Sequence, residues 1–365
     1  MPGKTGGFSC VFLAKIVSIL LVILVMEGIT GCGSGSTPTP IPIPVPEALF
    51  TVSTTISCPV LASHRQSLPT YIWLVLDRSK SMPRECAHSL EKFFLLPGFL
   101  VYIGKLVQPE KLYFAMELIG PDKEFLHPTP ISKINERDII SQLGSPDDII
   151  GNSPTNEYEK ALERIKDQMS IQQVRRVAVI LTDGTFSGPD YEKKERENIS
   201  RTLWDIQNNG GEVYVLLCST SNKEFWEELK ANGLLSAPPY QFPEGFKEFG
   251  EKLFPGGSLR NMGWFSGPPN FEIPLPGEGI TASVSLAIIT NDDADFLLPY
   301  VDSKGKSGSI LLERFVKNIY VGNHTFELSE FGPMDCQGPV LRFTRRQSVD
   351  AGFYIIQNNL ALSFQ

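Results

Sequence analysis

The stretch that decides the fold is Tyr71-Ile-Trp-Leu-Val-Leu-Asp77-Arg-Ser79-Lys-Ser81. Its first six residues are all apolar or aromatic, which predicts a strand buried on both faces of a mostly parallel sheet. A carboxylate and two hydroxyls follow at once, on Asp77, Ser79 and Ser81. Because ligands of open α/β sheets bind beyond the carboxyl ends of such strands, these side chains lie where a site is expected.

A second apolar stretch ends in the same way. Residues 175–184 read Arg-Arg-Val-Ala-Val-Ile-Leu-Thr-Asp183-Gly184, so another strand delivers a carboxylate to the end of the sheet. Between the two stretches lies the hydroxyl-rich loop Gly151-Asn-Ser153-Pro-Thr155-Asn-Glu, just before a helical pattern. The three segments offer only oxygen ligands, which suit a hard octahedral ion. We expect Mg²⁺, with Mn²⁺ as the second choice.

This combination resembles the metal-ion-dependent adhesion site of the von Willebrand factor type A (vWA) family. That site has an Asp-x-Ser-x-Ser run, a Thr loop of Gly-Gly-Thr-x-Thr-Gly type and a strand that ends in Thr-Asp-Gly. The residues that match this pattern one by one are Asp77, Ser79, Ser81 and Asp183. The resemblance implies a doubly wound, mostly parallel, Rossmann-like α/β domain, which we expect over residues 68–254.

The middle loop departs from the family pattern. Register places Ser153 at the Thr position, whereas Thr155 keeps the residue type two places later. Either hydroxyl is a candidate ligand. By resemblance, the ion binds a protein partner, because an Asp or Glu carboxylate of that partner takes the open coordination position.

The order of strands and helices along the chain agrees with such a domain. Strands are predicted at 71–77, 111–120, 124–131, 175–182 and 212–219, with helical patterns between them. The first helix is predicted to begin after Pro83 and to break near Pro97-Gly98, since proline removes a donor and glycine often ends helices. From residue 255 onward, short apolar runs separated by Gly, Pro, Asn and Asp predict a smaller all-β, sandwich-like domain to residue 365.

The N-terminal 31 residues are expected to be a lipoprotein signal peptide. Two lysines precede an apolar run at 16–26, and Ile29-Thr-Gly-Cys32 resembles a bacterial lipobox, in which Cys32 carries the lipid. The proline-rich segment that follows Cys32, within residues 32–50, predicts a tether, and residues 51–67 a lead-in segment. Together these features predict an extracytoplasmic protein anchored to the membrane of a bacterial cell envelope.

The net charge of the chain bears on its binding partners, and its cysteines bear on whether disulfides can form. Without residues 1–32 the chain has 31 basic and 40 acidic residues, a net charge of −9, which argues against nucleic acid. The remaining cysteines, Cys58, Cys86, Cys218 and Cys336, permit two disulfides whose pairing the sequence leaves open. Cys218, inside an apolar strand, is equally compatible with a buried thiol.

Three functions remain open from the sequence. We expect first a binding module and no enzyme, because no nucleophile–base pair, His-Glu-x-x-His motif or phosphate-binding Gly loop occurs. The second is a metal-dependent hydrolase, for which Asp147, Asp148 and Asp190 are the acidic loop residues available. The third is a structural envelope module in which the ion only ties loops together.

Overall fold

The computed structural model describes residues 68–108, 110–119, 123–143, 158–169, 173–186, 189–254, 262–267, 270–277, 279–291, 297–331, 337–345 and 348–359. The expectations for the signal peptide, Cys32, the tether, the lead-in segment, Ser153, Thr155, Cys58 and Cys336 lie outside these residues. Within them, no helix combines the length and the apolar character needed to cross a membrane.

The first sheet has six strands in the order β3-β2-β1-β4-β5-β6, and only β3 runs antiparallel to its neighbour. Its strands are β1 (Thr70–Asp77), β2 (Leu112–Ile119), β3 (Lys123–Pro130), β4 (Arg175–Thr182), β5 (Glu212–Leu217) and β6 (Tyr240–Gln241). The expected mixed α/β architecture with a mostly parallel sheet is confirmed. In the β1–β4 register Leu76 lies opposite Leu181, so Asp77 and Asp183 reach the same edge of the sheet.

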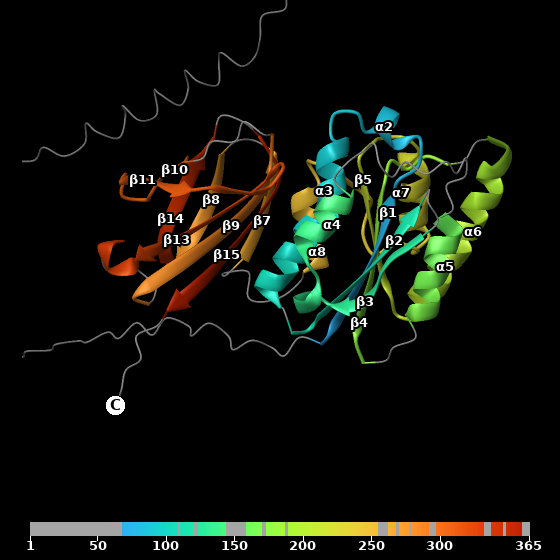
Figure 1. Cartoon of the computed structure of the whole chain (residues 1–365), viewed down its shortest axis with the longest axis horizontal. Coiled ribbons are helices and arrows are strands. Elements are labelled where there is room, and N and C mark those ends of the chain that lie inside the picture. Colours follow the sequence, from blue (N-terminus) through green and yellow to red (C-terminus); the bar gives the residue numbers. More distant parts are fainter. Residues whose placement is uncertain are drawn as a thin grey trace, which may run out of the picture. The chain divides into compact units, whose positions relative to one another are not determined.

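Helices cover both faces of this sheet (Figure 1). They are α2 (Met82–Glu85), α3 (Leu90–Val107), α4 (Glu136–Leu143), α5 (Tyr158–Gln168), α6 (Pro189–Asn208), α7 (Lys223–Ala231) and α8 (Phe246–Leu253). Alternate residues of β1 enter two separate cores: Leu74 and Leu76 pack with α3, α4 and α8, whereas Trp73 and Val75 pack with α5, α6 and α7. The continuous apolar run in β1 is thus explained by burial on both faces.

The predicted break of the first helix is wrong. A four-residue helix, α2, comes first, and α3 then runs without interruption from Leu90 to Val107 with Pro97 inside it. Gly98 allows close packing, because a Cβ at this position would lie 2.2 Å from Cγ1 of Ile140 on α4. The Pro-Gly pair therefore marks a helix–helix contact and not a helix end.

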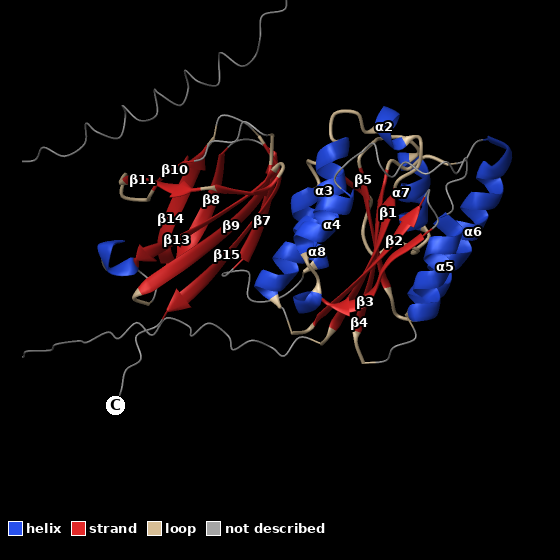
Figure 2. Ribbon diagram, viewed as in Figure 1, coloured by secondary structure: helices blue, strands red, loops and turns tan. Residues whose placement is uncertain are grey.

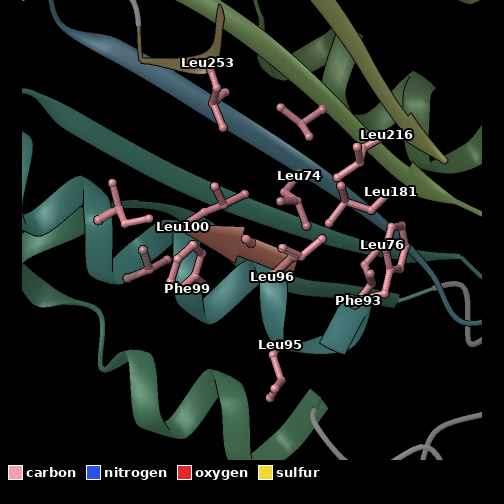
Figure 3. Close-up of a cluster of buried hydrophobic side chains, with 14 of the residues drawn as sticks. Leu74, Leu76, Phe93, Leu95, Leu96, Phe99, Leu100, Leu181, Leu216 and Leu253 are labelled. Atoms are coloured by element: carbon pink, nitrogen blue, oxygen red, sulfur yellow. The ribbon is translucent and has the colours of Figure 1, made fainter. Parts of the chain in front are cut away.

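Helix α3 is apolar around most of its circumference because it is buried on several sides. Figure 3 shows Leu96 and Leu100 facing the strands, close to Leu74. Leu95 points to the opposite side of the helix. A helix buried in this way cannot be distinguished from a strand or a membrane segment by an amphipathic pattern.

The C-terminal region forms two antiparallel sheets (Figure 2). One has the order β11-β10-β14-β8 and the other β12-β13-β9-β15-β7. The strands are β7 (Met262–Gly267), β8 (Asn270–Pro276), β9 (Thr281–Ile289), β10 (Leu297–Val301), β11 (Ser307–Leu311), β12 (Glu313–Val316), β13 (Ile319–Glu327), β14 (Gln337–Thr344) and β15 (Val349–Asn359). One buried cluster takes side chains from both sheets, including Ile273 and Leu286, which is the packing of a sandwich.

The α/β region and the β region share part of their core and lie in one compact unit. Trp264 of β7 stacks on Phe254 and meets the edge of Phe246 on α8, with ring centroids 5.8 and 5.6 Å apart. Gly250 of α8 makes room for this indole, since a Cβ there would lie 2.4 Å from the ring. Lys92 of α3 and Asp350 of β15 add an ion pair at 2.8 Å.

Candidate metal centre

Asp77 lies at the end of β1 with no exposed surface, and both of its carboxylate oxygens accept hydrogen bonds. Oδ1 accepts from the backbone N–H of Ser79 at 2.8 Å. Oδ2 accepts from the Tyr158 hydroxyl at 2.9 Å and from the Thr182 hydroxyl at 2.7 Å. The carboxylate is therefore fixed in one orientation at the edge of the sheet.

Asp183, just beyond β4, is equally buried but only half satisfied. Its Oδ1 accepts from both the backbone N–H and the hydroxyl of Thr185, each at 2.8 Å. Its Oδ2 is buried and has no hydrogen-bond partner among the described residues. A buried carboxylate oxygen without a partner is costly, so this atom requires a cation or a donor.

Hydroxyl groups connect the two strand ends. The Ser79 and Ser81 Oγ atoms lie 2.9 Å apart, and the Ser81 and Thr185 hydroxyl oxygens lie 2.7 Å apart. Because the single hydroxyl proton of Thr185 goes to Asp183, Ser81 is the donor to Thr185. These hydrogen bonds connect the loop after β1, residues 78–81, to Asp183 through Ser81 and Thr185. Three hydroxyl oxygens thus gather beside a buried carboxylate.

The two buried carboxylates, Asp77 and Asp183, interact electrostatically at the ends of β1 and β4. Burial, followed by the charge of Asp183, raises the pKa of the Asp77 carboxyl above its usual range. No three His, Cys, Asp or Glu side chains in the described ranges come together as a metal cluster. A metal here would need hydroxyl ligands as well as carboxylates, and oxygen donors of this kind fit Mg²⁺ or Mn²⁺.

The structure brings together four of the predicted ligands: Asp77, Ser79, Ser81 and Asp183. Ser153 and Thr155 lie outside the described residues, as do Asp147 and Asp148. Asp190 belongs to the first turn of α6.

Sequence reasoning missed two residues of the site. Thr185 lies two positions after Asp183, and a hydroxyl so close to a candidate ligand was the available signal. Tyr158, the first residue of α5, is fully buried and donates to Asp77 from another element. Nothing in the local pattern around residue 158 indicates that contact.

Arg78 separates the first two candidate ligands and points into the protein. It is fully buried, its guanidinium carbon lies 4.2 Å from the centroid of the Phe94 ring, and Nη1 donates to the Leu143 carbonyl at 2.7 Å. Leu143 is the last residue of α4, where a cation is favourable to the helix dipole. Arg78 therefore links the loop after β1 to the C-terminal end of α4.

The loop after β5 joins the site from a third strand. A disulfide connects Cys86, next to α2, with Cys218, next to β5, with Cα atoms 5.4 Å apart. The sequence left open whether Cys218 forms a disulfide or is a buried thiol, and the structure shows the disulfide. In the same loop, the Ser221 hydroxyl donates to Glu85 at 2.8 Å and the Asn222 amide donates to the Gly184 carbonyl at 3.1 Å.

No family model and no curated protein matches the chain. Among solved structures it is similar to the manganese-loaded TRAP protein of Plasmodium vivax, with 11% identity and a TM-score of 0.40, over 72% of this chain and 94% of that chain. It is also similar to the pilus adhesin SpaC of Lactobacillus rhamnosus GG, with 9% identity and a TM-score of 0.38, over 80% of this chain and 44% of that one. A third is proximal thread matrix protein 1 of the mussel byssus, with 16% identity and a TM-score of 0.29, over 40% and 35%. At these identities and TM-scores the similarities do not identify a family.

Proposed function

We propose that this chain is a vWA-like binding protein of the cell envelope, which holds Mg²⁺ at the ends of β1 and β4 and uses it to bind a protein partner. Ser79 and Ser81 contact the ion directly, together with Ser153 or Thr155 from the middle loop. Asp77 and Asp183 hold it directly or through water. Mn²⁺ substitutes for Mg²⁺.

The observation that carries the proposal is the buried Oδ2 of Asp183, which has no partner among the described residues and lies in a cluster of hydroxyls. A hard cation satisfies this atom and also offsets the charge of the second buried carboxylate. Neutral hydroxyl ligands leave such an ion short of negative charge. An Asp or Glu carboxylate of a partner supplies that charge.

The rim of the site also favours an acidic partner. Lys80, directly before Ser81, is exposed. Arg84, after Ser81, is also exposed, but its charge is paired with Glu85 at 2.8 Å. The positive charge of Lys80, one residue before a proposed ligand, would attract an acidic partner. Exposed charges of this kind act mainly on the association rate and on specificity.

Membrane anchoring is the second part of the proposal and rests on the sequence of the N-terminal segment. Replacing Cys32 with serine should block acyl labelling and release the protein from membranes in detergent-free fractionation. The released variant should still bind metal, because the first candidate ligand, Asp77, lies more than forty positions after Cys32. Unchanged acyl labelling would refute the anchor without affecting the metal site.

The metal site is tested by titrating Mn²⁺ and Mg²⁺ into the wild type and Asp183→Ala by calorimetry. We expect the variant to bind more weakly by more than about tenfold, since it loses a charged ligand. Asp77→Ala should behave in the same way, and Ser79→Ala or Ser81→Ala should cost less, because water can replace one hydroxyl. Asp167→Ala, which removes an exposed carboxylate on α5, is the matched control. Equal affinities in wild type and Asp183→Ala would refute the site.

Partner binding needs a separate experiment. Immobilised wild type and Asp183→Ala should be compared for capture of envelope proteins in Mg²⁺ and in a chelator. A specific partner is retained only by the wild type and only with the ion. Ser153→Ala and Thr155→Ala then identify the hydroxyl of the middle loop. If Mg²⁺-dependent phosphatase, nuclease or peptidase activity appears and is lost in Asp183→Ala, the hydrolase alternative replaces the binding function.

A further inference from the structure

The segment that carries Ser81 has little local support of its own. Ser81 precedes α2, a helix of only four residues that ends at Cys86. So short a helix is unstable alone, because nucleation is costly and few hydrogen bonds repay it. The ladder between β1 and β4 ends at Leu76 and Leu181, five residues before Ser81. Contacts outside the sheet must therefore place this hydroxyl.

Three anchors hold the segment. Met82 is fully buried in the core, Cys86 is linked to Cys218, and Glu85 accepts the hydrogen bond from Ser221. Two of the three come from one loop, the β5–α7 loop of residues 218–222. Because β4 lies between β1 and β5 in the sheet, the disulfide joins the segments that follow the two strands on either side of β4, the strand that precedes Asp183.

The same loop also holds the β4 side of the site. Asn222 donates to the Gly184 carbonyl at 3.1 Å, and the backbone N–H of Cys218 donates to the Thr182 carbonyl at 3.0 Å. The loop has internal order as well, since Ser221 N–H donates to Ser219 Oγ at 3.1 Å. The β5–α7 loop is therefore connected both to the segment that carries Ser81 and to the segment after β4 that carries Asp183 and Thr185.

We propose that the β5–α7 loop is a positioning clamp, in which Cys86–Cys218 and Glu85–Ser221 hold Ser81 against Thr185 and thereby set the affinity of the site for its ion. The inference rests on the metal site proposed above. None of these four clamp residues is proposed to touch the ion. Their effect is to keep the two hydroxyls 2.7 Å apart, so that little ordering remains when the ion binds.

The first test removes the covalent link. A peptide map without reduction should show Cys86 joined to Cys218, and a map without that link overturns the clamp. In calorimetry at 25 °C, Cys86→Ala/Cys218→Ala should bind Mn²⁺ about tenfold more weakly than wild type, a change of about 1.4 kcal/mol. Replacing both cysteines leaves no unpaired thiol from this pair. The folded state of the variant is checked by circular dichroism.

A control separates positioning from a general loss of stability. Leu341→Ala removes a buried side chain of the β sandwich, from a core cluster that contains no residue of β5, and should lower the melting temperature. It should leave the Mn²⁺ affinity of the folded protein unchanged. If Leu341→Ala weakens binding as much as the double cysteine variant does, the effect reports stability and the clamp is overturned.

The hydrogen bond provides a second, independent test that does not depend on the cysteine variant folding. Glu85→Ala and Ser221→Ala should each weaken Mn²⁺ binding by about threefold, and the double variant should be no weaker than the poorer single variant, because both remove one interaction. Wild-type affinity in both variants would overturn the clamp. Failure of wild type itself to bind Mn²⁺ would instead refute the metal site.

Discussion

At the scale of single residues, Asp183 has one oxygen bound by Thr185 and another that meets no donor in the described part of the chain. The Oδ2 atom is buried without a compensating hydrogen bond from the described residues, which is unfavourable in a protein without metal. Asp183→Asn should therefore stabilise the metal-free protein by about 1 kcal/mol while it weakens metal binding.

Thermal unfolding in chelator and in Mg²⁺ measures both effects. The metal-free variant should melt above the metal-free wild type, and added Mg²⁺ should raise the melting temperature of wild type alone. A variant that is less stable than wild type in chelator would show that Asp183 has a stabilising partner after all.

The buried Arg78 side chain stabilises the fold in two ways: it packs on the Phe94 ring and it donates a hydrogen bond to the Leu143 carbonyl. Arg78→Ala should cost roughly 3 kcal/mol, since it opens a cavity beside Phe94 and leaves the Leu143 carbonyl without this donor. Arg78→Met keeps most of the volume and should cost less. Urea denaturation of the two variants gives both values, and equal losses would mean that packing on Phe94 contributes nothing.

The sequence predicted the charged and hydroxyl residues at the strand ends, because a motif with fixed spacing places them there. It could not predict the Tyr158–Asp77 contact, whose partners are 81 positions apart and meet only through the fold. It also gave no reason for Arg78 to point inward, since nothing local identifies Phe94 as its partner.

At the scale of elements, the uninterrupted α3 predicts opposite effects for two adjacent residues. Pro97→Ala should stabilise the protein by about 1 kcal/mol or more, because it restores a helix donor and a good helix former. Gly98→Ala should destabilise it by about 1–3 kcal/mol, because the new Cβ overlaps Ile140. Chemical denaturation of both variants is the measurement, and a destabilising Pro97→Ala would contradict the helix as described.

The break expected at Pro97-Gly98 was a local inference, and tertiary packing overrides it. Backbone preferences of these residues act over one turn, whereas burial of α3 between the sheet, α4 and the β region involves its whole length. The parallel strands were predictable because their burial on both faces leaves a continuous apolar run.

The starts of β4 and β5 and the end of α8 are held together by Arg175. It donates to both carboxylate oxygens of Glu212 and to the carbonyls of Lys252 and Leu253. Burial acts to raise the pKa of Glu212, but the hydrogen bonds from Arg175 and Tyr214 outweigh it and hold this pKa below its usual value. The carboxylate form is therefore the stabilising one.

Because the pKa of Glu212 is lowered on folding, its contribution is present above the unfolded value of about 4.5 and is lost as pH falls through the folded value. Glu212→Gln should cost about 1 kcal/mol at pH 7, a modest figure because the side chain is one-third exposed. The difference from wild type should shrink as the pH approaches 3. Urea titrations at both pH values test this, and a difference that grows in acid would reverse the sign.

At the scale of the whole molecule, the shared core around Trp264 couples the α/β region to the β region. We expect one unfolding transition for the chain, because neither region can lose its structure without exposing this core. Hydrogen exchange should give similar unfolding free energies for the most protected amides of β4 and β15. Two clearly separate values would mean that the regions unfold independently.

The sequence indicated a change of architecture near residue 255 from the switch between helical patterns and short apolar runs. It could not indicate that the two regions share a core, because Gly250 and Trp264 each read as an ordinary helix or strand residue. Their fit becomes visible only once α8 and β7 are placed side by side.

The Cys86–Cys218 link also has a consequence for biosynthesis. Of the four cysteines after Cys32, it joins the second to the third, across 132 positions. If the chain is exported as proposed, Cys58 and Cys86 emerge together long before Cys218, so an oxidase acting on successive cysteines produces the wrong partner first. Reaching the native pair then requires thiol–disulfide exchange or folding ahead of oxidation. A host without a disulfide isomerase should therefore accumulate molecules in which Cys58 is bonded to Cys86.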